Sequence, residues 1–414
     1  MPHQAFANFT EKTSHTMHRR KTTVVHIGNL PMGGDYPIRV QSMTTCPTTD
    51  TEGCIEQIKR IVDAGGEYVR LTTQGIREAE NLKNIRDGLR RDGYTVPLIA
   101  DVHFNANVAD VAALYADKVR INPGNYVDPA RKFKHLEYTD EEYAEEIKKI
   151  EARFVPFLNI CKEHHTAIRI GVNHGSLSDR IMSRYGDTPA GMVESCMEFL
   201  RICVKEQFTD VVISIKASST NVMVTTVRLL VKAMDAEDMH FPLHLGVTEA
   251  GEGEDGRLKS AVGIGTLLVD GIGDTIRVSL SEAPEKEIPV AFGILQAAGA
   301  RISKPEFVSC PGCGRTMYNL EETIARIKTA FAENFGTAEA KAKWPTANSL
   351  KIAIMGCIVN GPGEMADADY GYVGAGRGKV SLYKCKECIE MNIPEDDAVS
   401  RLIDFIKNDL TSQQ

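Results

Sequence analysis

The chain has 414 residues, a hydrophobic content of 43% and a formal net charge of −8, and its basic residues form no block beyond residues 18–21. This length favours two domains of a globular protein, and the acidic balance argues against nucleic-acid or anionic-membrane partners. No apolar run reaches about 18 residues and no apolar stretch lies near the N-terminus, so we expect a cytoplasmic protein without a spanning helix or secretory signal.

The expected organisation, in chain order, has three parts. A flexible polar segment covers residues 1–22, a barrel domain residues 23–290 and a small α+β domain residues 291–414. The ten cysteines are expected to be metal ligands and buried thiols rather than a disulfide framework.

Short apolar runs alternate with helical patterns through the first two thirds of the chain. The runs are residues 38–41, 68–71, 98–100, 118–121, 168–172, 211–215, 243–247 and 275–279. Eight such βα periods predict a TIM (β/α)8 barrel within an α/β protein. An open doubly wound sheet is the alternative, although no Gly-x-Gly-x-x-Gly follows the first strand to support a dinucleotide site.

Charged and polar side chains lie at and just after these runs, at positions that converge on the C-terminal mouth of a TIM barrel. The cations are Arg70, Arg120, Arg169, Lys216 and Arg277, and Asn173 and Ser279 accompany them. A single arginine at a strand end is more often part of an ion pair. Five cations at one mouth would repel one another without an anion, so we expect a ligand with several negative charges, most simply two phosphates.

Three further side chains near the mouth have alternative roles. Glu249 beside these cations would stay ionised and could move a proton, or it could pair with Arg277. Asp101 and His103 could form a structural pair or contact the substrate.

The C-terminal region contains the sequences Cys310-Pro-Gly-Cys313 and Met355-Gly-Cys357-Ile-Val-Asn-Gly-Pro-Gly-Glu364. Two thiolates three residues apart can reach one metal centre, and a third can arrive from a separate strand end. The pattern favours an iron–sulfur cluster, with Glu364 as an oxygen ligand that could yield its place to substrate.

A structural zinc site is the alternative, because Cys385-Lys-Glu-Cys388 supplies a second Cys-x-x-Cys pair. The interval between the pairs is longer than in a usual zinc ribbon, and zinc leaves Cys357 unexplained. Around these cysteines we expect helices at residues 319–334 and 395–410 and strands at residues 350–355 and 379–383.

Taken together, these residues resemble the 4-hydroxy-3-methylbut-2-enyl diphosphate synthase family of the methylerythritol phosphate route to isoprenoids. The matching segments, in order, are residues 37–44, 100–104, 120–125, 168–177, 214–216, 246–251, 271–280, 310–315 and 355–364.

The resemblance implies a 4Fe-4S cluster on Cys310, Cys313 and Cys357, with Glu364 as fourth ligand, and catalytic roles for Glu249 and Glu364. It implies that 2-C-methyl-D-erythritol 2,4-cyclodiphosphate lies in the barrel mouth. The implied substrate contacts are Arg70, Arg120, Asn125, Arg169, Asn173, Lys216, Arg277, Ser279 and Asn360.

The implied reaction takes two electrons, one at a time, from ferredoxin or flavodoxin. The cyclic diphosphate opens, a hydroxyl is lost as water, and (E)-4-hydroxy-3-methylbut-2-enyl diphosphate is formed. The family pattern also implies a homodimer in which the cluster domain of one subunit closes over the barrel of its partner.

Two features depart from the family pattern. Cys385 and Cys388 lie outside its ligand set, and residues 365–374 resemble a longer branch with an extra domain between barrel and cluster. Here only about twenty residues separate Glu285 from Phe307. A pterin-type synthase barrel with a zinc appendage and an iron–sulfur sensor or carrier are the competing functions, and the second would not need five cations at strand ends.

Overall fold

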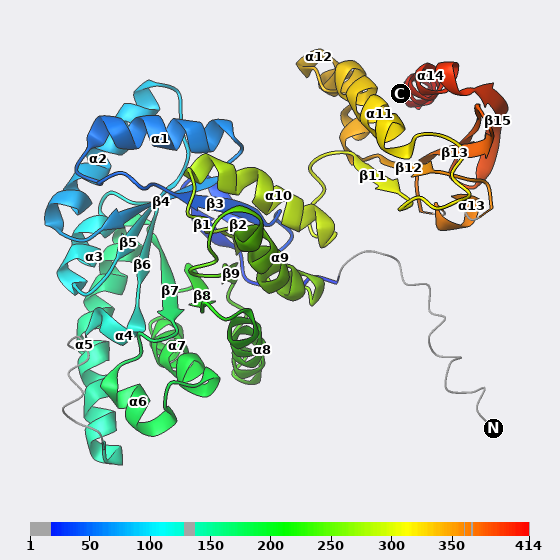
Figure 1. Cartoon of the computed structure of the whole chain (residues 1–414). Helices are drawn as coiled ribbons and strands as arrows, with labels where there is room; N and C mark the ends of the chain where they lie inside the picture. Colours follow the sequence, from blue (N-terminus) through cyan, green and yellow to red (C-terminus); the bar gives the residue numbers. More distant parts are fainter. Residues whose placement is uncertain (1–17, 128–136, 360, 366, 414) are drawn as a thin grey trace, which may run out of the picture. The chain divides into compact units, whose positions relative to one another are not determined.

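The computed structural model describes residues 18–127, 137–359, 361–365 and 367–413, which form two compact units, Met1–Arg301 and Ile302–Gln414 (Figure 1). Each unit has its own hydrophobic core. In these ranges no helix has the length and apolar character needed to cross a membrane.

The larger unit contains a parallel sheet in the order β8-β7-β6-β5-β4-β3-β10-β9. Its strands are β3 (Arg39–Met43), β4 (Tyr68–Thr73), β5 (Leu98–Val102), β6 (Lys118–Ile121), β7 (Ala167–Asn173), β8 (Val211–Lys216), β9 (His244–Leu245) and β10 (Thr275–Ile276). A parallel bridge between Ile213 and Leu243 joins the two end strands and closes the barrel. The predicted TIM barrel is confirmed, and the open sheet is wrong.

Helices follow the strands and cover the outside of the barrel (Figure 1). They are α1 (Thr51–Asp63), α2 (Ile76–Arg91), α3 (Ala106–Ala113), α4 (Pro123–Tyr126), α5 (Asp140–His164), α6 (Asp179–Tyr185), α7 (Pro189–Lys205), α8 (Thr220–Ala236), α9 (Gly253–Val269), η2 (Pro284–Lys286) and α10 (Glu287–Ala297). The side chain of Asp50 caps α1, and a Thr139–Glu142 capping box begins α5. Their apolar faces complete the core around the strands.

A short hairpin, β1 (Val25–Ile27) and β2 (Leu30–Met32), packs on the residues that begin the barrel strands. The hydroxyl of Tyr68 donates to the carbonyl of Leu30 at 2.6 Å. The preceding residues are also fixed, because the backbone N–H of Arg20 donates to the carbonyl of Gly271 at 2.8 Å. Residues 18–22 therefore belong with the barrel and not to the expected flexible segment, whose residues 1–17 lie outside the described ranges.

The smaller unit has a five-stranded sheet in the order β11-β12-β13-β14-β15. Its elements are β11 (Glu306–Ser309), α11 (Leu320–Phe335), α12 (Ala338–Lys343), η3 (Pro345–Ser349), β12 (Lys351–Met355), α13 (Gly361–Glu364), β13 (Tyr370–Gly376), β14 (Lys379–Lys384), β15 (Glu387–Pro394) and α14 (Glu395–Ser412). Helices α11 and α14 share a core with the sheet. The four expected elements of this unit are present, and the strands β11, β13 and β15 and the short helices α12 and α13 were not predicted.

Candidate functional site

The register of the barrel strands brings the predicted polar residues to one level. Asp101 on β5 pairs with Arg120 on β6, which pairs with Arg169 on β7. Because side chains alternate between the two faces of a strand, the side chains of these paired residues point to the same side of the sheet, the barrel interior.

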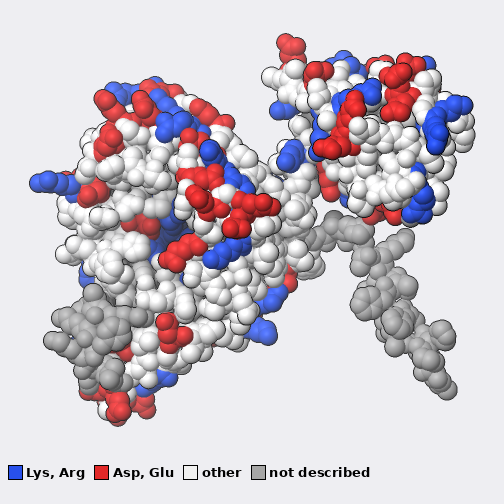
Figure 2. All heavy atoms as spheres, viewed as in Figure 1, with Lys and Arg blue, Asp and Glu red and all other residues white. Residues whose placement is uncertain are grey.

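These side chains line a cavity of about 260 Å³. Its lining residues are Arg70, Asp101, His103, Arg120, Arg169, Asn173, Lys216, Thr248, Glu249, Arg277 and Ser279. Figure 2 shows Lys and Arg atoms together in a hollow of the larger unit. All five predicted cations thus lie around one cavity, with Glu249, Asn173 and Ser279 beside them.

Two predicted substrate contacts are not part of this lining. Asn125 is buried in α4, where its side-chain oxygen accepts a hydrogen bond from the backbone N–H of Phe104 at 3.4 Å. Asn360 lies outside the described residues.

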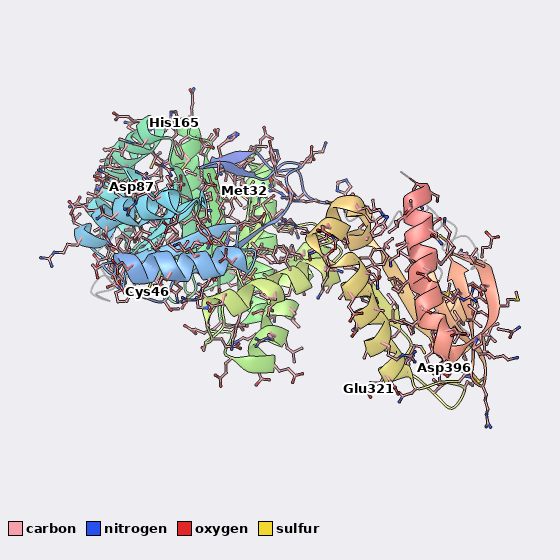
Figure 3. All side chains as sticks on the ribbon, turned by 90° about the horizontal axis from the view of Figure 1, so that it is seen from above. Met32, Cys46, Asp87, His165, Glu321 and Asp396 are labelled. Atoms are coloured by element: carbon pink, nitrogen blue, oxygen red, sulfur yellow. The ribbon has the colours of Figure 1, made fainter. Side chains whose placement is uncertain are left out.

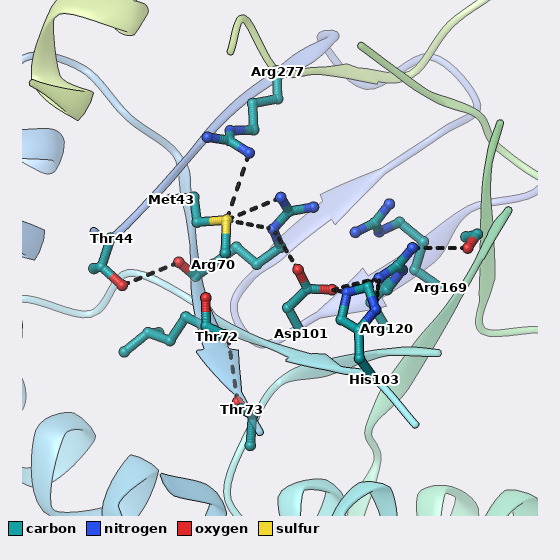
Figure 4. Close-up of polar contacts among 12 residues, drawn as sticks. Met43, Thr44, Arg70, Thr72, Thr73, Asp101, His103, Arg120, Arg169 and Arg277 are labelled. Carbon is teal, nitrogen blue, oxygen red and sulfur yellow. Dashed lines mark hydrogen bonds and ion pairs between the residues drawn. The ribbon is translucent and has the colours of Figure 1, made fainter. Parts of the chain in front are cut away.

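Asp101 is a buried carboxylate among the cations (Figure 4). Its Oδ1 lies 3.1 Å from Nη1 of Arg120, and its Oδ2 lies 3.5 Å from Nε of Arg70. Burial by itself would raise the pKa of Asp101, but the two guanidinium groups hold that pKa well below its usual range. His103 also contacts Arg120, and its Nε2 is 3.6 Å from Asp101. Asp101 is therefore bound into the cation cluster as a fixed counter-charge.

A second buried carboxylate, Glu287 at the start of α10, neutralises Arg277. Its oxygens lie 3.3 Å and 3.4 Å from Nη2 and Nε of Arg277, and the hydroxyl of Ser42 donates to it at 2.8 Å. Glu287, and not Glu249, is the ion-pair partner of Arg277. Sequence reasoning missed Glu287 because it lies beyond the strand ends, on the helix that follows the barrel.

Met43 is another residue that the sequence did not single out. Its sulfur lies 3.0 Å from Nη2 of Arg70 and 3.5 Å from Nη1 of Arg277, between the two guanidinium groups (Figure 4). A thioether is a weak acceptor and carries no charge. It separates two cations without neutralising either.

Arg169 and Lys216 are not paired with a carboxylate of the described residues in this way. Arg169 donates from Nη1 to the hydroxyl of Ser214 at 2.5 Å, but its buried Nε and Nη2 have no partner in the described part of the chain. No ion pair of Arg169 or Lys216 occurs among the described carboxylates. Burial, with the neighbouring cations, lowers the pKa of both groups well below the usual range and lowers that of Arg70 to about 10. Buried donors without partners at the rim of a cavity call for an anionic ligand.

Glu249 lies in the cavity wall with an unusual backbone. Its φ is +55°, and its carbonyl accepts a hydrogen bond from Nζ of Lys259 at 3.3 Å. A left-handed conformation is uncommon for a residue other than glycine. The residue is exposed and lines the cavity, and its carboxylate forms no hydrogen bond or ion pair with the described residues.

The smaller unit has a separate cavity of about 150 Å³ built around cysteines. Its lining residues are Cys310, Pro311, Gly312, Cys313, Arg315, Thr316, Met355, Gly356, Cys357, Gly361 and Glu364. The parallel pairing of Ser309 with Ile354 brings the ends of β11 and β12 together. The backbone N–H of Gly356 then donates to the sulfur of Cys310 at 3.2 Å.

The thiol of Cys313 is activated by its surroundings. Nε of Arg315 donates to the Cys313 sulfur at 3.5 Å, and this hydrogen bond lowers the pKa of the exposed thiol. The thiolate is the form that binds metals. A cation and a backbone N–H that point at sulfurs suit a cluster ligated by thiolates.

Within the described ranges, no three His, Cys, Asp or Glu side chains converge on the position of a single metal ion. A 4Fe-4S cluster makes a different demand, because each thiolate binds its own iron atom. Three cysteines and one glutamate around one cavity fit that donor set. Cys385 and Cys388 do not line the cavity, so the described residues do not assemble the four-thiolate zinc site.

Comparisons with protein families match both units. The model of the GcpE TIM-barrel domain matches residues 22–292, and that of the GcpE protein C-terminal domain matches residues 306–408.

Curated relatives match over nearly the whole chain. A 4-hydroxy-3-methylbut-2-en-1-yl diphosphate synthase (ferredoxin) from Prochlorococcus marinus is 50% identical, with 97% of this chain and 95% of the relative covered. One of the same description from Gloeothece citriformis is 51% identical, with 95% and 94% covered. A flavodoxin-dependent synthase from Bacteroides thetaiotaomicron is 48% identical, with 94% and 98% covered.

The relatives differ in length. The alignment with the Bacteroides relative extends over 613 positions, so that relative has a long portion without a counterpart in the 414 residues here. The alignment with the Prochlorococcus relative extends over 405 positions and covers 95% of it. A chain of this length without the extra portion therefore also occurs among curated relatives.

Proposed function

The chain belongs to the GcpE family, and we propose on that premise that it catalyses the reaction for which its relatives are named. It converts 2-C-methyl-D-erythritol 2,4-cyclodiphosphate into (E)-4-hydroxy-3-methylbut-2-enyl diphosphate, a precursor of isoprenoids. The electron donor is a ferredoxin or a flavodoxin, the two classes that appear in the relatives' names.

The observation that carries this proposal is the unpaired charge in the barrel mouth. Among the described residues, Arg169 has two buried N–H groups without hydrogen-bond partners, and Lys216 forms no ion pair with a carboxylate. A diphosphate supplies both acceptor oxygens and negative charge at that place. Arg70, Arg120 and Arg277 complete the binding site, and Asp101 and Glu287 fix their guanidinium groups before the ligand arrives.

The reaction consumes two electrons and one proton. A ring carbon–oxygen bond breaks and leaves its oxygen on the diphosphate, a neighbouring hydroxyl takes the proton and departs as water, and a double bond forms between the two carbons. Glu249 delivers or holds the proton, because its free carboxylate lines the cavity. Asn173 and Ser279 orient the hydroxyl groups of the ligand from the same wall.

Cys310, Cys313 and Cys357 hold a 4Fe-4S cluster, and Glu364 is its fourth ligand. When bound, the cluster supplies electrons one at a time. The hydrogen bond from Arg315 lowers the pKa of Cys313, which favours metal binding by its thiolate, and Glu364 is exposed, which suits a ligand that can be exchanged. A homodimer is part of the proposal, and light scattering of the purified protein tests it.

Calorimetric titration with the cyclodiphosphate tests the binding site. Arg169→Met should weaken binding by about 1.5–3 kcal/mol, the scale of a charge-assisted contact. Arg153→Met is the matched control, because Arg153 pairs with Asp110 at 2.6 Å outside the mouth. Equal affinities for the wild type and both variants would exclude the barrel mouth as the diphosphate site.

A further inference from the structure

Cys46 and Cys54 form a close pair of thiols in the larger unit. Cys46 lies in the loop between β3 and α1, and Cys54 lies in the first turn of α1. Their sulfur atoms are 3.2 Å apart. Figure 3 labels Cys46 beside the blue helices of this unit. The pair is separate from the cysteine cavity of the smaller unit.

The two thiols differ in exposure. Cys54 is fully buried, and its thiol also donates to the carbonyl of Pro47 at 3.5 Å. Burial and the contact with Cys46 raise the pKa of Cys54 above the usual range for a thiol. Cys46 is partly exposed, so an external reagent meets Cys46 first and Cys54 second.

A cavity gives access to the exposed member of the pair. Its volume is about 330 Å³, and it is lined by Thr45, Cys46, Pro47, Thr48, Thr72, Gln74 and Glu78. The side-chain oxygen of Gln57 accepts from the backbone N–H groups of Thr45 and Cys46, at 2.7 Å and 3.4 Å. These contacts hold the loop with the Cys46 sulfur next to that of Cys54.

We propose that Cys46 and Cys54 are a modification site that reacts with low-molecular-weight disulfides. The Cys46 thiol loses its proton, and its thiolate attacks one sulfur of the reagent, forms a mixed disulfide and releases the first half of the reagent as a thiolate. The Cys54 thiol then loses its proton, and its thiolate attacks the Cys46 sulfur, forms the protein disulfide and releases the second half of the reagent as a thiolate. The two released thiolates take up the two protons that the protein thiols lost. Two protein thiols are oxidised, and one reagent disulfide is reduced to two thiols.

The position of the pair gives this reaction its context. The loop is joined to β4, because the backbone N–H of Thr44 donates to the carbonyl of Arg70 at 2.9 Å and the hydroxyl of Thr48 to that of Thr72 at 2.6 Å. The proposed oxidation of Cys46 and Cys54 thus takes place in a loop at the rim of the barrel, and it does not involve Cys310, Cys313 or Cys357.

The full chain offers a direct test, because tryptic cleavage after Arg39 and Lys59 gives a peptide that contains Cys46 and Cys54 and no other cysteine. The protein is incubated anaerobically with oxidised glutathione, alkylated under denaturing conditions and digested. We expect the peptide to be unalkylated and two hydrogen atoms lighter than its reduced form. Recovery of the doubly alkylated peptide while exposed Cys385 carries glutathione would overturn the proposal.

Single variants separate the two steps. Cys54→Ala should leave a stable glutathione adduct on Cys46, and Cys46→Ala should leave Cys54 free to be alkylated. Cys161→Ala is the matched control, because this buried thiol forms no hydrogen bond with another sulfur among the described residues, and it should leave the result for residues 40–59 unchanged. Glutathione on Cys54 in the Cys46→Ala variant would contradict the assigned order.

Discussion

A Cβ atom on Gly171 would lie 2.6 Å from Nε of Arg120, so the glycine on β7 leaves the space that the arginine of β6 occupies. The carbonyl of Gly171 also accepts a hydrogen bond from Nη2 of Arg120 at 2.9 Å. At Gly246 an added Cβ would instead lie 2.9 Å from the backbone carbonyl oxygen of Arg277 and 3.4 Å from Lys216, which is an ordinary contact distance for the lysine. One of the five cations, Arg120, thus depends on a glycine of the neighbouring strand for its position.

Gly171→Ala should displace Arg120 and weaken binding of the cyclodiphosphate by about 1.5–3 kcal/mol, the worth of one charge-assisted contact. Calorimetric titration measures the change. Gly265→Ala is the control, because nothing lies within 4 Å of its added Cβ and alanine suits its place in α9. Wild-type affinity in Gly171→Ala would mean that Arg120 does not hold the ligand.

Glu287→Gln should lower the free energy of unfolding by about 3 kcal/mol, because it leaves the buried side of Arg277 without a counter-charge. Urea denaturation measures the loss. Added diphosphate should stabilise this variant more than the wild type, since the anion replaces the missing charge. Glu285→Gln should change stability by less than about 1 kcal/mol, because Glu285 pairs with the exposed Arg60. Equal losses in both variants would contradict the special role of Glu287.

Asp101→Asn should change how stability depends on pH. The pKa of Asp101 is held well below its usual range in the folded protein, so its stabilising contribution is complete above the unfolded pKa of about 3.9 and is lost as the pH falls towards the folded pKa. The difference in unfolding free energy between wild type and variant should stay constant from about pH 8 to 6 and shrink below about pH 5. Urea denaturation across this range measures it, and a constant difference down to pH 3 would refute the ionic role.

Replacement of Cys310, Cys313 or Cys357 by serine should remove most of the bound iron and all turnover, because an alcohol cannot replace a thiolate at a cluster. Absorption spectra with iron and sulfide counts after anaerobic purification measure the loss. Cys385→Ser should keep iron and activity, since Cys385 does not line the cavity. Full iron content in Cys313→Ser, or its loss in Cys385→Ser, would revive the zinc alternative.

Glu249→Gln should lower turnover by about 10²–10⁴-fold, because the amide keeps the shape of the side chain but cannot carry a proton. Substrate affinity and the spectrum of the resting cluster should stay at wild-type values. Glu364→Ala is the contrasting variant, and it should make the cluster labile and alter that spectrum before substrate is added. A wild-type turnover rate in Glu249→Gln would exclude it as the proton carrier.

The sequence predicted the location of the cavity residues where they lie on the strand of a repeating βα unit of the barrel. Arg120 and Arg169 lie within short apolar runs, and β-strand alternation with parallel register directs both side chains inward. The same reasoning could not find Glu287, which a later helix brings back to the mouth. Met43 was missed because a methionine on a strand is expected to be part of the hydrophobic core, although here its sulfur contacts two guanidinium groups.

Glycine content and mixed polarity concealed other elements. β13 reads Tyr-Gly-Tyr-Val-Gly-Ala-Gly, in which the glycines weaken a strand pattern, and β15 reads Glu-Cys-Ile-Glu-Met-Asn-Ile-Pro, which has no regular alternation, at an edge of the sheet. Asn125 follows strand β6, so it was expected at the barrel mouth. The short helix α4 instead places its side chain in the protein interior, where it accepts a hydrogen bond from the backbone of Phe104. Tertiary packing determines that β13 and β15 are strands and that Asn125 is buried, and the spacing of residues along the chain does not reveal this packing.

The β1–β2 hairpin has a consequence for kinetics. It covers the starts of the strands, with Val25, Ile27 and Met32 packed against Tyr68, so the described part of the barrel is sealed at the end opposite the mouth. Substrate and product then enter and leave through the same barrel mouth, and the diphosphate of each binds the same cations. The product should therefore act as a competitive inhibitor, and a new substrate molecule can enter only after the old diphosphate has departed.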